Sequence, residues 1–185
     1  QSAQVAAAES RAEVFEDFSK PDLSHWFLSG EAFGKTPVQS RLESRGVPFS
    51  LSFSTWLGDR AAHSSGLSNR LEGTIRSQTF TIQKKHVLYH AGGRGAKINL
   101  IIDNFRMIQY PIYGGRTINL DTKDKLQWFV QDVEKWVGHN AYIELIDPGE
   151  GFLTVDRILF SDEGPPPEPV NPVTRQLLAN RECDS

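Results

Sequence analysis

Three carboxylates lie close together in the sequence, and paired carboxylates hydrolyse glycosides when they flank a bound sugar. They are Glu144, Asp147 and Glu150. Glu144 alternates with the apolar Ile143 and Leu145, which predicts a carboxylate on the solvent face of a strand that ends beside a turn. We therefore expect no glycosidase activity from this group.

Motifs for other reactions and for metals are also missing from the sequence. It contains no Gly-x-Ser-x-Gly nucleophile elbow and no His-Glu-x-x-His zinc motif. The glycines of AGGRGAK lack the spacing of a phosphate-binding loop, and this run is interpreted as a hairpin turn. His86 and His90 lie on a predicted strand, where a rise of about 3.3 Å per residue separates them by about 13 Å and prevents them from binding one metal ion. The sequence therefore predicts a protein that is not an enzyme.

The elements that must position any site are predicted to be β-strands. Phe49, Leu51 and Phe53 alternate with serines, so that large apolar side chains share one face of a strand. Further strand-like runs occupy residues 79–82, 86–90, 97–103, 128–133, 141–147 and 152–160. Glycine-rich runs such as AGGRG, YGG and DPGEG separate them, as in strand-to-strand turns. Many short strands without a long helix predict an all-β fold, an antiparallel β-sandwich.

The composition is that of a folded domain without an overall basic field. The 185 residues are 38% hydrophobic and include 11 Phe and 4 Trp, enough for a packed core. A net charge of −3 gives no general attraction to nucleic acid. No apolar run approaches the roughly 20 residues that span a bilayer, so we expect no membrane insertion by this chain. Cys183 is the single cysteine, which excludes an internal disulfide.

Charge is unevenly distributed along the chain. Residues 60–97 are rich in Arg and Lys, whereas Asp and Glu dominate residues 121–168. A solvated outer face of the sandwich accounts for this pattern, and the alternative is a site for an anionic ligand.

Both ends are predicted to lie outside the folded domain. Residues 1–13 are small and polar, and we interpret them as a linker. The segment DEGPPPEPVNP favours an extended polyproline spacer, because its prolines cannot donate strand hydrogen bonds. We therefore place the β-sandwich at residues 14–162 and a proline-rich linker and tail at residues 163–185.

Three stretches together resemble a known family. They are FEDFSKPDLSHWFLSGEAFGKTP, LEGTIRSQTFTIQKKHVLYHAGGRGAKINLIIDNFRMIQYPIYGG and LQWFVQDVEKWVGHNAYIELIDPGEGFLTVDRILFSD. They resemble the domain that large planctomycete cytochrome c domain-containing proteins carry between two planctomycete-specific domains of unknown function. The resemblance covers roughly residues 14–162, and PIYGG and WVGHNAYIELID are its most specific parts. The order of motifs is more distantly similar to carbohydrate-binding modules and to the sandwich domain of levanase-like glycoside hydrolases.

The resemblance implies a galactose-binding-like jelly roll in an extracytoplasmic protein that is periplasmic, secreted or held at the cell surface. A polysaccharide or other glycan is the implied ligand, and the flanking domains of the parent protein are the implied partners. No Cys-x-x-Cys-His haem attachment motif occurs in this chain. The alternative function is a structural spacer or interaction domain that binds no small ligand and positions the flanking domains.

A glycan site in such a sandwich needs an aromatic platform and fixed polar groups, and the end loops supply both. The candidate ligand-binding residues in or beside the predicted turns are Arg94, Asn104, Tyr110, Tyr113, Arg116 and Trp128. If the loops share one end of the sandwich, these side chains form a small cup. The alternative is that Tyr110 and Tyr113 only cap the core.

The resemblance also implies a structural calcium ion where the first and last strands lie side by side. Its candidate ligands are Glu16, Asp17 and Asp156, with a backbone carbonyl such as that of Gly34. Strand alternation puts Leu153, Val155 and Leu159 on one face and Asp156 on the opposite, mostly apolar face. A lone carboxylate there needs a partner. The alternative partners for Asp156 are an arginine or backbone N–H groups.

Overall fold

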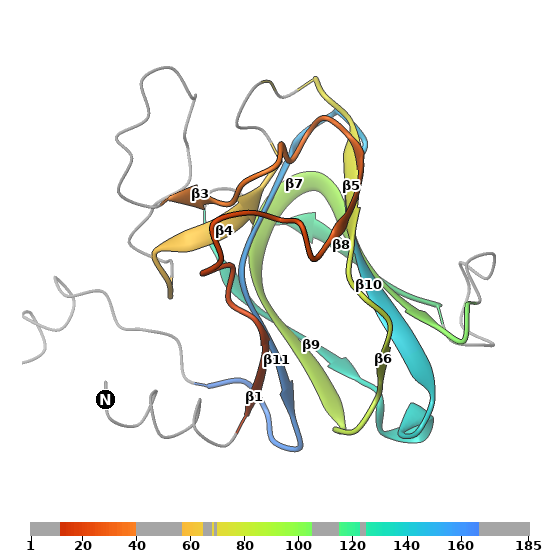
Figure 1. The fold of residues 1–185 in the computed structure, drawn as a ribbon. Helices are drawn as coiled ribbons and strands as arrows, with labels where there is room; N and C mark the ends of the chain where they lie inside the picture. The colour runs from red at the N-terminus through yellow and green to blue at the C-terminus, as the bar shows by residue number, and fades with distance from the viewer. Residues whose placement is uncertain are drawn as a thin grey trace, which may run out of the picture.

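Antiparallel strands make up more than half of the described residues. The computed structural model describes residues 12–39, 57–64, 68, 70–104, 115–122 and 125–166. Within these ranges the helical element is the short 3-10 helix η2 (Glu134–Trp136), and the strands form one strongly curled sheet (Figure 1). The predicted all-β sandwich is therefore confirmed. The predicted strand around Phe49 lies outside the described residues.

The long strand β7 (His86–Ile102) belongs to both layers of the sandwich. Its first half pairs with β9 (Gln127–Asp132) on one side and with β11 (Phe152–Ser161) on the other. Its second half pairs with β8 (Gly115–Asp121) and β10 (Asn140–Asp147). Figure 1 shows this strand as the green ribbon that curves over between the two layers.

The remaining strands extend the two layers outward from β7. The first layer continues from β11 to β1 (Glu13–Glu16) and β4 (Arg60–His63), and from β4 to β3 (Val38–Gln39). The second layer continues from β10 to β6 (Phe80–Thr81) and β5 (Gly73–Arg76), and from β5 to the edge strand β2 (Phe27–Gly30). The pairing of β1 with β11 brings the first and last strands side by side, as the sequence resemblance implied.

The hairpin turn predicted at AGGRG is wrong, because the single strand β7 continues through this run without a chain reversal. The glycines are needed for close packing: a Cβ on Gly92 would lie 2.5 Å from the Lys125 carbonyl oxygen, and one on Gly93 would lie 2.4 Å from that of Phe152. Gly95 has a φ of 66° and lies in a bulge where the pairing with β8 shifts register. A glycine-rich run thus bends one strand from one layer into the other.

The core lies between the two layers and follows the alternation of the strands. On the second layer Ile75, Leu145 and Ile98 are register partners and are all buried in the core. On the first layer Tyr89 and Ile158 face them from β7 and β11. Residues that alternate with these point to the two outer faces.

Strand β11 breaks the predicted alternation at one position. Its pairing with β7 shifts register between Val155 and Arg157, which leaves Asp156 as an extra residue in a β-bulge. A bulge reverses which side chains face the core. The core side chains of β11 are Leu153, Val155, Ile158 and Phe160. Leu159 is buried outside that core, so the prediction that it shares a face with Leu153 and Val155 is wrong.

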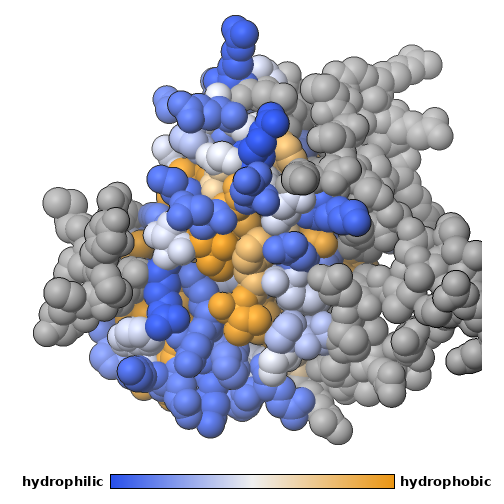
Figure 2. Space-filling model, turned by 180° about the vertical axis from the view of Figure 1, so that it is seen from behind, coloured by the Kyte–Doolittle hydropathy of each residue, from blue (hydrophilic) through white to orange (hydrophobic). Residues whose placement is uncertain are grey.

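Exposed apolar side chains come from several separate elements. The large ones are Val14, Phe27, Leu28, Val130 and Val137. Figure 2 shows hydrophobic side chains gathered near the centre of the rear face, with hydrophilic ones around them. No helix in the described ranges has the length and hydropathy needed to cross a membrane.

Candidate functional site

The residues predicted to form an end-loop cup are only partly described by the structure, and Arg94 and Asn104 lie at different ends of one strand segment. Arg94 is exposed at the bend of β7, whereas Asn104 lies in the turn beyond the other end of that strand, with a φ of 62°. The strand from Arg94 to its end at Ile102 spans eight residue steps, or about 26 Å along the chain. Tyr110 and Tyr113 lie outside the described residues.

Arg116 and Trp128 contact different partners in different layers. The Arg116 guanidinium lies over the ring of Trp136, with its Cζ 4.7 Å from the ring centroid. The half-buried Trp128 packs against His90, with ring centroids 4.9 Å apart. The predicted binding role of these residues stays a prediction, and the structure places them apart from Arg94.

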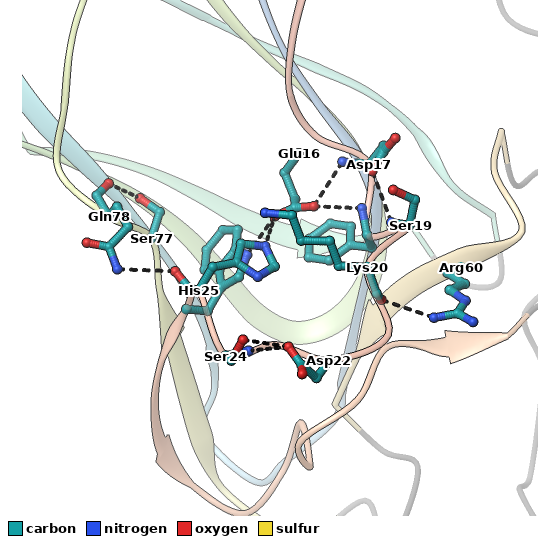
Figure 3. Close-up of polar contacts among 12 residues, drawn as sticks. Glu16, Asp17, Ser19, Lys20, Asp22, Ser24, His25, Arg60, Ser77 and Gln78 are labelled. Carbon is teal, nitrogen blue, oxygen red and sulfur yellow. Dashed lines mark hydrogen bonds and ion pairs between the residues drawn. The ribbon is translucent and has the colours of Figure 1, made fainter.

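The carboxylate of Glu16 is surrounded by N–H donors (Figure 3). Its Oε1 accepts hydrogen bonds from the backbone N–H groups of Asp17 at 3.1 Å and Phe18 at 2.8 Å. Its Oε2 accepts one from the Trp26 indole at 2.8 Å and contacts the His25 Nε2 at 2.5 Å. This carboxylate therefore fixes the segment that connects β1 to β2.

Asp156 is fully buried and has two protein partners. Its Oδ1 contacts the His90 Nδ1 at 2.6 Å, and its Oδ2 accepts a hydrogen bond from the Leu57 backbone N–H at 2.5 Å. A backbone donor is one of the partners that the sequence left open for Asp156.

Asp17, the third predicted calcium ligand, has a lowered pKa. Partial burial acts to raise the pKa of its carboxyl group, but the hydrogen bonds with Ser19 lower it by more.

These contacts do not fit a calcium site on Glu16 and Asp156. Calcium takes six to eight oxygen ligands, whereas N–H donors occupy both of these carboxylates. Among the described residues, no group of three or more His, Cys, Asp or Glu side chains gathers around one point. The calcium ion remains a prediction that would need other oxygens.

A row of side chains crosses the outer face of the second layer. The row consists of register partners on β2, β5, β10, β7 and β8, in the order Phe27, Arg76, Glu144, Asn99 and Thr117. Directly opposed residues of antiparallel strands point to the same face of a sheet. Their chain neighbours Ile75, Leu145 and Ile98 face the core, so the row faces outward. We call these five residues the polar row.

A second, parallel set of side chains borders the polar row on the same face. Its members, again in register across the five strands, are Ser29, Thr74, Ile146, Lys97 and Asn119. Hydroxyl and amide groups are thus half of the ten side chains on a surface held by regular strands. Within the row, the Thr117 Oγ1 donates a 2.8 Å hydrogen bond to the Asn99 Oδ1.

One end of the polar row is aromatic. The Cζ of Arg76 lies 3.8 Å from the ring centroid of the buried Tyr142 and 5.7 Å from that of Phe27. The Phe27 side chain is 55% exposed. A solvent-facing ring beside a guanidinium and several hydroxyl groups is the kind of surface that binds sugars.

The sequence places Glu144 on an outer strand face, and the structure agrees. Asp147, in contrast to Glu144, is buried. Its carboxylate accepts hydrogen bonds from the Ser64 hydroxyl and the Gly149 N–H. Sequence reasoning missed the polar row itself. The available signal was the set of polar residues at alternate positions in GTIR and KINL, but it does not show which strands are neighbours.

Comparison with known proteins found neither a matching family model nor a matching curated protein. A solved CBM61 structure in complex with β-1,4-galactotriose has 16% sequence identity and a TM-score of 0.48, and the alignment covers 78% of this chain and 94% of that one. The K1 adhesin domain of Lys-gingipain from Porphyromonas gingivalis has 10% identity and a TM-score of 0.47, over 80% and 97% of the two chains. A CBM35 module from Cellvibrio japonicus has 16% identity and a TM-score of 0.38, over 76% and 94%.

Proposed function

We propose that this domain is a non-catalytic module of a larger extracytoplasmic protein and that it binds a glycan on the outer face of its second layer. The polar row is the observation that carries the proposal. Sugar recognition needs hydrogen-bonding groups at fixed positions and an apolar surface for the C–H face of the ring. Asn99 and Thr117 supply the first, and Phe27 with the Arg76 guanidinium supplies the second.

The arrangement of the row suits an extended ligand. Five strands at a spacing of about 4.8 Å extend the row over roughly 19 Å, which is long enough for a short oligosaccharide. Strand positions hold side chains more rigidly than loops do, so less ordering entropy is lost on binding. The glycan ligand type itself comes from the sequence resemblance, and the proposal moves its site from the end loops to a strand face.

The test is a binding titration of the chain against a panel of neutral and acidic oligosaccharides, followed by variants of the row. We expect Asn99→Ala and Phe27→Ala each to weaken binding by about tenfold, because each removes one contact with the sugar. Lys85→Gln is the control, since Lys85 is an exposed cation whose partner is Glu134, outside the row.

Two results would contradict the proposal. Equal affinities for wild type and both row variants would remove the polar row from the site. A panel in which no glycan binds would favour the alternative of a spacer domain that holds flanking domains in a fixed geometry.

A further inference from the structure

Arg76 is the last residue of strand β5 and lies on the outer face, between its register partners Phe27 on β2 and Glu144 on β10. Its side chain is half-buried, and its guanidinium contacts the Tyr142 and Phe27 rings. Two aromatic neighbours restrict the position of this planar group and lower the entropy that a ligand would have to overcome. Arg76 is therefore preorganised at the aromatic end of the polar row.

The guanidinium of Arg76 has no acceptor within the described part of the chain. Its Nε is buried without a hydrogen-bond partner, and neither a hydrogen bond nor an ion pair joins it to its neighbour Glu144. By contrast, the half-buried Lys84 pairs with Asp162 and the exposed Lys85 pairs with Glu134. Arg76 carries five N–H donors, and a partly desolvated cation gains most from an acceptor that is itself charged.

The charges around Arg76 on this outer face come from three strands. Arg76 on β5 and Lys97 on β7 are positive, Glu144 on β10 is negative, and the outward residues of β2 and β8 in the two rows are uncharged. Within the two rows these charges sum to one net positive charge. A planar guanidinium fork matches a carboxylate or a sulfate, whose oxygens accept two parallel N–H bonds.

We infer that the polar row selects acidic glycans and that Arg76 binds a carboxylate or sulfate group of the sugar. This inference rests on the proposed glycan-binding function and adds the chemical class of the ligand. The shared chemistry is an anionic oxygen pair on a sugar ring, supplied by a uronic acid or by a sulfate ester.

The experiment compares three probes by isothermal titration calorimetry: neutral β-1,4-galactotriose, trigalacturonic acid and a sulfated galactan oligosaccharide of similar length. We expect at least one acidic probe to bind about tenfold more tightly than galactotriose. Its advantage should shrink as NaCl rises from about 50 to about 500 mM, because salt screens the charge pair. The preferred acidic probe identifies the carboxylate or the sulfate as the natural group.

Variants of Arg76 assign the selectivity to that residue. Arg76→Gln should weaken binding of the preferred acidic probe by about 10- to 100-fold while changing galactotriose binding little, because only the charged acceptor needs the guanidinium. Arg76→Lys keeps the charge without the fork and should retain part of the selectivity. Lys85→Gln removes the same unit of charge outside the row and should leave all three affinities unchanged.

Three outcomes overturn the inference. Galactotriose that binds as tightly as both acidic probes, or Arg76→Gln that weakens neutral and acidic probes equally, leaves the glycan-binding function intact and removes the acidic selectivity. Failure of all three probes to bind overturns the selectivity, and failure of the wider panel as well overturns the glycan-binding function. If Arg76→Gln does not fold, the wild-type salt dependence and Arg76→Lys still decide the question.

Discussion

The first layer buries two pairs of polar side chains on its outer side, whereas the polar side chains in the two rows on the outer face of the second layer are exposed or half-buried. On the first layer, His63 with Thr154 and His90 with Asp156 are all buried. On the second, Ser29, Lys97, Asn119 and Thr117 are exposed. Both faces belong to the same curled sheet. Strand pairing alone therefore does not determine on which face the polar side chains are exposed to solvent.

The difference shows what each set of polar groups does. Buried polar groups must be paired to offset their desolvation, as Asp156 is by His90 and by the Leu57 N–H. Such pairs stabilise the fold. The exposed groups of the second layer make few contacts with one another and contribute little to stability, which leaves them available to a ligand.

The largest expected effect comes from removing the carboxylate of the first layer. Asp156→Ala should lower the free energy of unfolding by about 3–5 kcal/mol, because it leaves the buried His90 ring and the Leu57 N–H without their acceptor. Urea denaturation measures the loss. Asn99→Ala, on the opposite outer face, is the matched control and should cost less than about 1 kcal/mol. Similar losses in the two variants would erase the contrast between the faces.

The next effect is a pH dependence that belongs to the first layer. Burial lowers the pKa of His63 from 6.5 to about 4. Between pH about 4 and 6.5, the His63 imidazole is protonated in the unfolded chain and neutral in the folded chain, so acid favours unfolding. Stability should therefore fall by about 3 kcal/mol as pH drops from about 6.5 to about 4, and it should change little from this residue above that window.

Chemical denaturation at several pH values measures this slope, and His63→Gln should flatten it. His139 is an exposed histidine paired with the exposed Asp103. His139→Gln is thus the control and should leave the slope close to that of wild type. An unchanged slope in His63→Gln would assign the acid sensitivity to other groups.

The smallest expected effect is that of calcium. Because N–H donors occupy Glu16 and Asp156, we expect these two carboxylates to hold no calcium ion, and melting curves in EDTA and in millimolar calcium superimpose if other oxygens hold none either. A melting temperature that rises with calcium would show an ion bound by the native state. Loss of that rise in Asp156→Asn would then restore Asp156 as a ligand.

The sequence alone determined the strands and the class of the fold. Period-two alternation at 128–133, 141–147 and 152–160 predicted β9, β10 and β11 to within a residue or two at each end. This works because alternation is a local consequence of strand geometry, in which successive side chains point to opposite faces. It also predicted that Glu144 would lie on an outer face.

Local sequence patterns did not predict the backbone conformation where it depends on contacts with residues distant in the sequence. AGGRG has the composition of a turn, but contacts from Lys125 and Phe152 make it a bend within one strand. The bulge at Asp156 adds one residue and reverses the faces of β11, and no composition rule signals it. In both cases, packing against distant segments overrides the local sequence.

The polar row was decided by the tertiary structure alone. Phe27, Arg76, Asn99, Thr117 and Glu144 come from five strands spread over most of the described chain, and they meet only because β5 pairs with β2 and β10 while β7 pairs with β10 and β8. These are long-range pairings whose register depends on burying the apolar face of every strand at once. The sequence determined which residues are polar, and the folding of the sheet determined which of them stand together.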